Sequence, residues 1–228
     1  MGRTRFAELM TAADGAVDLD EATLEITARL QPGLDRIEWL AALDVLAADC
    51  PTPTADGIAR YLFHDEHFVG NRRDYADWRN SCLDRVIASR TGIPITLSIV
   101  MIEVGRRLGV PLAGVGMPAH FIVGASAAGD GELDTFYDPF GGGTRLDRDG
   151  ARALFDEVTA GRVPWEDAYL APTPPRDIVI RVLNNLRATL RSRGDVLRLG
   201  IVMGLRGEVA ELAAAEATEI DAAIGVFN

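Results

Sequence analysis

The sequence contains no lysine, and all 23 side chains counted as lysine or arginine are arginines. Enzymes that form a Schiff base, carry pyridoxal phosphate or hold a nucleotide phosphate in a P-loop all need a lysine amine. These three classes are therefore excluded. The chain is also poor in cysteine: Cys50 and Cys82 are too few for a disulfide framework.

Long apolar runs and an excess of basic charge are missing as well. The longest apolar stretch, residues 93–104, is interrupted by polar side chains, and the first twenty residues hold no apolar run. Neither a membrane span nor a signal peptide is predicted. With 34 acidic residues the formal net charge is −11, which excludes a protein that follows nucleic-acid phosphates and favours basic partners. We predict a cytoplasmic protein with free thiols, and the sequence carries no signature of an oligomeric state.

The order of predicted elements indicates an α+β fold. Apolar residues recur at helical spacing, and strand composition marks 115–123 and 134–138, with the turn-rich residues 127–131 between them. The helix over 94–108 has almost no polar face, so we expect it to be central and buried against a small antiparallel sheet, with helices flanking this core at both ends. Prolines after residue 171 predict a linker that divides the chain into a domain over 1–171 and a helical tail over 172–228. The predicted helices cover residues 4–50, 54–63, 82–90, 94–108, 146–158 and 176–225.

His120 and Asp138 form the first candidate site. They lie 18 positions apart, and their midpoint, Gly129, falls in the predicted turn, so a symmetric hairpin would place them opposite each other. Cross-strand partners have Cβ atoms about 4.5–5.5 Å apart, close enough for a carboxylate to orient an imidazole. A slip of one residue would put them on opposite faces, and a purely structural pair would show the same pattern.

Cys82 is the candidate nucleophile for that pair. It follows two good N-cap residues, Asn80 and Ser81, and the start of a helix lowers the pKa of a thiol. A triad of Cys82 as nucleophile, His120 as general base and Asp138 as orienting carboxylate would then suit acyl transfer. A buried cysteine that only packs in the core is the alternative.

Other candidates for nucleophile or ligand are weaker. Hydroxyls within helices, such as those of Thr96 and Ser98, often bond to the preceding turn, and Cys50 has no partner in view. His64 and His67 have a spacing that can place two ligands on one helical face, but the zinc-protease pattern HExxH is absent. The glycines at 141–143 do not form a dinucleotide-binding motif. We therefore predict neither a metal site nor a cofactor.

Five blocks stand in a recognisable order: NSCLDRV at 80–86, RTGIPITLS at 90–98, GRRLGVP at 105–111, GVGMPAHF at 114–121 and DPFGG at 138–142. Together they resemble the bacterial Sir-B-type branch of the transglutaminase-like proteins, over roughly the whole chain. The block RVLNNL at 181–186 resembles the segment that opens a tetratricopeptide-like helical tail in that branch.

The resemblance implies a papain-like core with a Cys-His-Asp triad, whose cysteine begins the central helix. It assigns the general base to His120 and the orienting carboxylate to Asp138. Counted back from residues 106–109, however, the position of the nucleophile falls near Pro94 or Ile95, neither of which can attack a substrate. Either the branch has lost this chemistry, or Cys82, Thr96 or Ser98 substitutes from nearby.

Three functional hypotheses follow, of which a metal-dependent hydrolase that uses His64 and His67 with nearby carboxylates is the weakest. The first is a domain that retains the His-Asp pair and serves in binding or regulation, recognising a protein or peptide segment in the former active-site cleft. The second is a cysteine-type amide hydrolase or acyl transferase that uses Cys82, His120 and Asp138.

Overall fold

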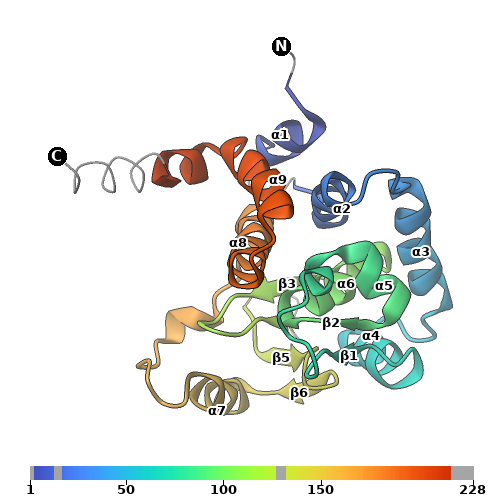
Figure 1. Cartoon of the computed structure of the whole chain (residues 1–228). Helices are drawn as coiled ribbons and strands as arrows, with labels where there is room; N and C mark the ends of the chain where they lie inside the picture. The colour runs from blue at the N-terminus through green and yellow to red at the C-terminus, as the bar shows by residue number, and fades with distance from the viewer. Residues whose placement is uncertain (1–2, 13–16, 127–131, 217–228) are drawn as a thin grey trace.

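The computed structural model describes residues 3–12, 17–126 and 132–216 and has a mixed helix and sheet architecture, which confirms the α+β prediction (Figure 1). In chain order the elements are α1 (Arg5–Met10), α2 (Leu19–Leu30), α3 (Arg36–Asp49), α4 (Ala55–Arg60), the π-helix η1 (Tyr61–Asp65), β1 (Val69–Gly70), the 3₁₀ helix η2 (Trp78–Ser81), α5 (Leu83–Ser89), β2 (Thr91–Gly92), α6 (Pro94–Arg107), β3 (Leu112–Val115), β4 (Ile122–Ala125), β5 (Thr135–Asp138), β6 (Thr144–Leu146), α7 (Arg148–Thr159), the 3₁₀ helix η3 (Asp167–Leu170), α8 (Pro175–Arg193) and α9 (Val196–Gly207).

Helix α6 is the buried centre predicted from its apolar composition. Every residue from Pro94 to Gly105 is buried, and the helix contacts α2, α3, α5 and the strands β3 and β4. Pro94 occupies the first turn, where a missing N–H costs nothing. At the other end Gly109 has a φ of 70°, and the Val110 N–H closes the helix on the Gly105 carbonyl at 2.8 Å.

The main sheet is antiparallel, with the strand order β3–β4–β5–β6. Because side chains alternate along a strand, Val123 and Tyr137 join the core around α6, while Ile122 and Phe136 pack with Phe155 of α7 in a second apolar cluster. The sheet therefore lies between α6 and α7 (Figure 1). The two short strands β1 and β2 pair in parallel just before α6 begins.

The prediction of a single strand over 115–123 is wrong. β3 ends at Val115 and β4 begins at Ile122, with a connection in which the His120 N–H returns to the Met117 carbonyl at 3.3 Å. Pro118 has no N–H to offer a strand ladder, and Ala119 adopts a φ of 62°, so the extended conformation cannot continue. His120 thus lies in a turn rather than within a strand.

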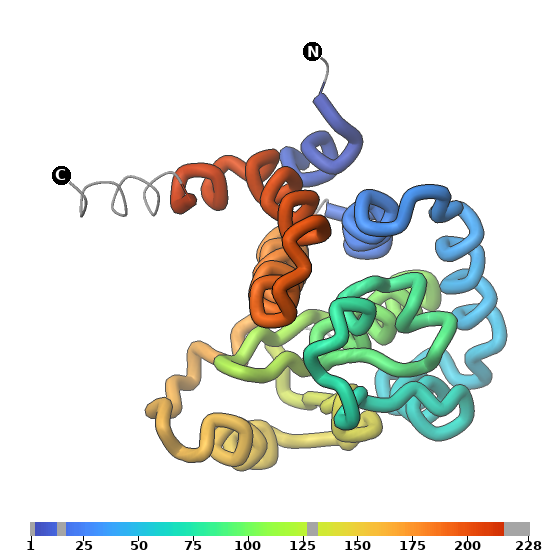
Figure 2. The backbone as a smooth tube through the Cα atoms, in the orientation of Figure 1, coloured from blue at the N-terminus to red at the C-terminus, as the bar shows by residue number. Residues whose placement is uncertain are grey.

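The terminal helices pack together on one side of the core. Figure 2 shows α1 beside α9, and the Thr4 hydroxyl bonds to the Glu208 carboxylate across this contact. α8 contacts α2, α6 and η2, and turns into α9 at Gly194, which has a φ of 69°.

The division of the chain at residues 171/172 stays a prediction, and the predicted turn at 127–131 lies outside the described residues. Among the described helices, none has the length and apolar character needed to cross a membrane.

Candidate functional site

The imidazole of His120 and the carboxylate of Asp138 are in contact. His120 Nε2 lies 2.9 Å from Asp138 Oδ1, and the two residues are 6% and 7% exposed. The predicted contact is therefore present, although the predicted register is not. Val123 pairs with Tyr137, so position 122 rather than 120 would face Asp138, and His120 reaches the carboxylate from the turn before β4.

Arg181 of α8 fixes that turn from outside the sheet. Its Nη2 donates to the carbonyl oxygens of Met117 and His120, each at 2.7 Å, and its guanidinium lies over the Phe121 ring at 5.4 Å. Burial lowers the pKa of Arg181. A Cβ at Gly116 would lie 2.9 Å from Arg181 Nη1, so a glycine there permits the close approach. Sequence reasoning placed 181–186 in a helical tail and missed this role.

The chain that follows Asp138 also holds its carboxylate. The Phe140 N–H donates to Asp138 Oδ1 at 3.1 Å, the same oxygen that contacts His120. A Cβ at Gly141 would lie 2.4 Å from Asp138 Oδ2. The segment DPFGG therefore shapes the carboxylate's surroundings: Gly141 permits close packing on Asp138, and Gly142 supplies a φ of 78° in the turn.

Cys82 lies in a different environment from the one expected. It is the N-cap residue of α5, fully buried, with Sγ 3.8 Å from the Trp78 carbonyl and a hydrogen bond to Thr27 of α2. Burial, reinforced by the negative charge of Asp84, raises the pKa of the thiol, opposite to the direction that the helix start suggested. Within the described part of the chain no interaction joins Cys82 to His120.

The hydroxyls near the start of α6 are bound to the backbone. Thr96 Oγ1 donates to the Asn80 carbonyl at 2.7 Å and accepts from the Ile93 N–H, while Ser98 Oγ donates to the Pro94 carbonyl at 2.8 Å. Both side chains are buried. Each hydroxyl is therefore engaged with the backbone, as hydroxyls in helices often are.

An aromatic and cationic surface covers His120. The Phe140 ring meets the imidazole edge-on at 6.2 Å, the Arg72 guanidinium lies over Phe140 at 4.7 Å, and the Tyr75 ring contacts it at 5.8 Å. Tyr75 is 52% exposed. We call Arg72, Tyr75 and Phe140 the Phe140 surface.

Asn80 holds this surface in place. Its side-chain amide donates to the Asp74 carbonyl at 2.8 Å and to the Tyr75 carbonyl at 3.2 Å, and its Oδ1 accepts from Asn71 at 2.9 Å. The sequence marked residues 68–78 only as a loop and Asn80 as a capping residue. The polar composition of this loop could not reveal that one buried side-chain amide ties residues 71–75 to η2.

His64 and His67, the two histidines of the HDEH segment, do not lie on one helical face. His64 lies in η1, and His67 follows it with a φ of 59°; both side chains are exposed. Nowhere in the described ranges do three or more histidine, cysteine or acidic side chains gather as a metal site would require.

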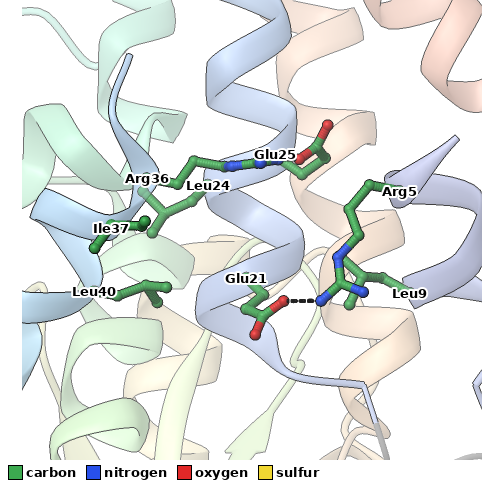
Figure 3. Close-up of a pocket in the computed structure, with 8 residues that line it drawn as sticks. All are labelled: Arg5, Leu9, Glu21, Leu24, Glu25, Arg36, Ile37 and Leu40. Atoms are coloured by element: carbon green, nitrogen blue, oxygen red, sulfur yellow. Dashed lines mark hydrogen bonds and ion pairs between the residues drawn. The ribbon is translucent and has the colours of Figure 1, made fainter.

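A cavity of about 180 Å³ opens between α1, α2 and α3, far in sequence from the predicted site residues (Figure 3). Leu9, Leu24, Ile37 and Leu40 supply its apolar wall, and Figure 3 shows Arg5 pointing to Glu21 at its edge. The opposite edge carries the ion pair of Arg36 with Glu25. Because its charges are already paired, this cavity offers no reactive group.

The sequence of this chain is similar to those of known proteins. The family model described as the Transglutaminase-like superfamily matches residues 17–184. A UPF0162 protein of Xylella fastidiosa is 42% identical over 134 residues, which cover 58% of this chain and 47% of that protein. A UPF0162 protein of Vibrio cholerae is 33% identical over 137 residues, 56% of this chain and 50% of its own length.

A mammalian protein is also similar. F-box only protein 21 of Mus musculus is 36% identical over 107 residues, which make up 45% of this chain and 17% of the mouse protein. The chain spans about half the length of the bacterial relatives that it matches. No solved structure matches. The family match covers α2 through most of α8, including every element that contributes to the contact between His120 and Asp138, and the chain therefore belongs to the transglutaminase-like superfamily.

Proposed function

We propose that this chain is a Sir-B-type transglutaminase-like protein that binds a protein or peptide segment at the Phe140 surface and does not catalyse acyl transfer. The observation that carries this proposal is the start of α6. Pro94 and Ile95, at the position that the superfamily resemblance assigns to the nucleophile, are buried side chains without a reactive atom.

The remaining candidate nucleophiles support the same conclusion. Covalent catalysis needs an accessible nucleophile within hydrogen-bond reach of its base. The thiol of Cys82 is fully buried with a raised pKa, and the hydroxyls of Thr96 and Ser98 bond to the backbone. Without a nucleophile, the contact of His120 with Asp138 serves to fix the turn that lies beneath Phe140.

The charges at this surface favour an acidic segment as the ligand. The chain as a whole carries a net charge of −11, yet Arg72 and Arg73 stand next to each other, both exposed. Within the described residues neither arginine has an ion pair with a carboxylate. The Arg72 guanidinium lies over the Phe140 ring, and this contact limits its freedom, so it is preorganised to receive a planar carboxylate. Exposed Tyr75 adds aromatic contact area, which is typical of binding surfaces.

We expect the Arg72→Gln variant to lose affinity for acidic peptides by about 5–10-fold, because a charge-assisted hydrogen bond contributes on the order of 1.5–3 kcal/mol before solvent screening at an exposed site reduces it. The measurement is fluorescence anisotropy with two labelled decapeptide pools, one with a central Asp-Glu-Asp and one with a central Arg-Lys-Arg. The acidic pool should bind and the basic pool should not.

The matched control is Arg152→Gln. Arg152 is an exposed arginine on α7, and no ion pair with a carboxylate is recorded for it among the described residues. It should leave binding unchanged. Tighter binding of the basic pool, or an equal loss in both variants, would refute the proposed ligand chemistry.

A cysteine-type amide hydrolase or acyl transferase that uses Cys82, His120 and Asp138 is the second candidate. The observation in its favour is the retained bond between imidazole and carboxylate, which is how a general base is oriented in a triad. It requires a rearrangement that exposes Cys82.

We also propose that residues 172–228 form a tetratricopeptide-like tail, in which α8 and α9 are the first helical pair, and that the protein is cytoplasmic.

A further inference from the structure

A second concave site lies away from His120 and Asp138. This cavity of about 450 Å³ opens between the α4–η1 segment on one side and the β5–β6 hairpin on the other. Its volume falls within the range of roughly 300–1,000 Å³ that is usual for small-molecule sites. The residues that line it are Asp56, Ala59, Arg60, His64, Tyr137, Gly143, Thr144 and Arg145.

The charge of this cavity is opposite to that of the chain. Arg60, His64 and Arg145 line it, against the single carboxylate of Asp56. That carboxylate is already engaged, because it accepts a hydrogen bond from the Tyr137 hydroxyl at 2.7 Å and lies 3.3 Å from Arg145 Nε. For Arg60 and His64 no hydrogen bond or ion pair is recorded within the described ranges. Two exposed basic side chains are thus left for an anion.

The backbone places these donors from two directions. Arg60 ends α4, and His64 follows in the π-helix η1, where the Glu66 N–H bonds to the Tyr61 carbonyl at 2.8 Å. π-helical turns within helices are rare and occur frequently at functional sites. Arg145 comes from the opposite wall, because the register of β5 and β6 sets it directly across from Tyr137.

Gly143 fixes the spacing between the two walls. Its φ is 74°, and a Cβ there would lie 2.4 Å from Cδ2 of Phe63, a residue of η1. Only glycine permits this contact between the start of β6 and η1. The donors on η1 and on β6 are therefore held at a set distance by close packing.

An adjoining cavity of about 210 Å³ shares Asp56, Tyr137 and Arg145 with the first. Its further lining includes the apolar residues Val110, Pro111 and Ala125, beside Thr54, Ser126 and Thr135. A ligand with an anionic group and a compact, uncharged body would fit the two together.

We propose that this cavity binds the phosphate monoester of a small organic molecule. Arg60 and His64 would donate to the terminal phosphate oxygens, and Arg145, whose Nε faces Asp56, would add its remaining guanidinium N–H groups; three donors suit phosphate better than a carboxylate with two oxygens. The organic body would occupy the adjoining cavity beside Val110 and Pro111. This site is independent of the Phe140 surface and of the function proposed for it.

The test is a titration of the full chain with inorganic phosphate and with phenyl phosphate, followed by two-dimensional amide NMR. We expect saturable shifts centred on residues 59–64 and 143–145, with phenyl phosphate binding at least about 3-fold more tightly, because its ring removes apolar surface from water. Arg60→Gln should weaken binding of phenyl phosphate by about 10-fold.

Arg152→Gln is the matched control and should bind phenyl phosphate as the unmodified chain does. Shifts that do not saturate, or equal affinity in Arg60→Gln, would overturn the proposal. A phosphoserine tripeptide that binds more tightly than phenyl phosphate would contradict a small-molecule ligand. Loss of acidic-peptide binding at the Phe140 surface would leave these results unaffected, so the two proposals fail separately.

Discussion

In a Cys50→Ser variant, Cys82 should react with iodoacetamide at least about 1,000-fold more slowly in native buffer than in denaturant. The attacking species is the thiolate, and burial both removes access and raises the pKa of this thiol. Labelling of Cys82 must therefore wait for the chain to open, and opening of a stable domain is rare. Mass spectrometry of the labelled protein over time measures the rate.

The Cys82→Ser variant provides the comparison, since it leaves Cys50 as the remaining thiol. Cys50 is 8% exposed, whereas Cys82 is 0% exposed. Cys50 follows the C-terminal end of α3, with Sγ 3.6 Å from the Thr52 carbonyl. It should react faster than Cys82, although burial raises its pKa as well. Rapid labelling of Cys82 that disappears in a His120→Ala variant would instead support the triad.

The Arg107→Met variant should lose about 1.5–3 kcal/mol of its free energy of unfolding, since it removes charge-assisted hydrogen bonds to two buried carboxylates and leaves Arg106 as their remaining arginine partner. Arg107 donates to Asp20 Oδ2 at 2.7 Å and to Glu103 Oε2 at 2.8 Å. The two carboxylate side chains are each 2% exposed. The cluster joins α2 to α6 beneath the central core.

The loss of unfolding free energy in the Arg107→Met variant should depend on pH. Burial, with the nearby charge of Asp20, raises the pKa of Glu103 to about 7. Burial is also the largest single effect on Asp20, but the hydrogen bond and charge of Arg107, together with hydrogen bonds from Glu103 and the Glu21 N–H, outweigh it and hold the pKa of Asp20 below its usual value. Between the ordinary pKa of glutamate and pH 7 the native state binds the extra proton, so Glu103 destabilises the fold increasingly as pH rises through that interval. Ionised Asp20 instead stabilises the fold, and its contribution to the free energy of unfolding is lost only as pH falls through its lowered pKa.

At pH 8 both carboxylates are ionised, and in Arg107→Met these two buried negative charges share the single guanidinium of Arg106, whereas at pH 5 Glu103 is protonated. Urea denaturation at the two pH values should therefore show the larger loss at pH 8. The control is Arg79→Met, which removes a pair with Asp77 in which the arginine side chain is 61% exposed and should cost less than about 1 kcal/mol. A loss below that of the control, or a larger loss at pH 5, would contradict this description of the cluster.

Sequence periodicity predicted the helices that are determined by their own residues, without reference to distant parts of the chain. The apolar composition of residues 94–108 was enough to identify α6 as buried, and Thr54 caps α4 as its position suggests. The alternating composition around Pro118 misled the strand prediction, because one missing N–H and one residue with positive φ interrupt a ladder without changing hydrophobicity.

The environment of each site residue depends on distant partners and could not be predicted. Cys82 is buried because α2 supplies Thr27, and the His120 turn is fixed by Arg181 of α8. The sequence gives no pattern that joins such residues, since only tertiary packing brings them together. The contact of His120 with Asp138 could be predicted because His120 closely precedes β4 and Asp138 ends β5, and these two strands pair, although their register could not be predicted.

The central claim is that this transglutaminase-like domain retains an oriented histidine without a nucleophile beside it. Its most direct test is intact-mass spectrometry of the full chain after incubation with p-nitrophenyl acetate, followed by peptide mapping. We predict no acetyl adduct on Cys82, Thr96 or Ser98 and the same ester hydrolysis rate in a His120→Ala variant. A stoichiometric adduct on one of these three residues, absent from His120→Ala, would contradict the account.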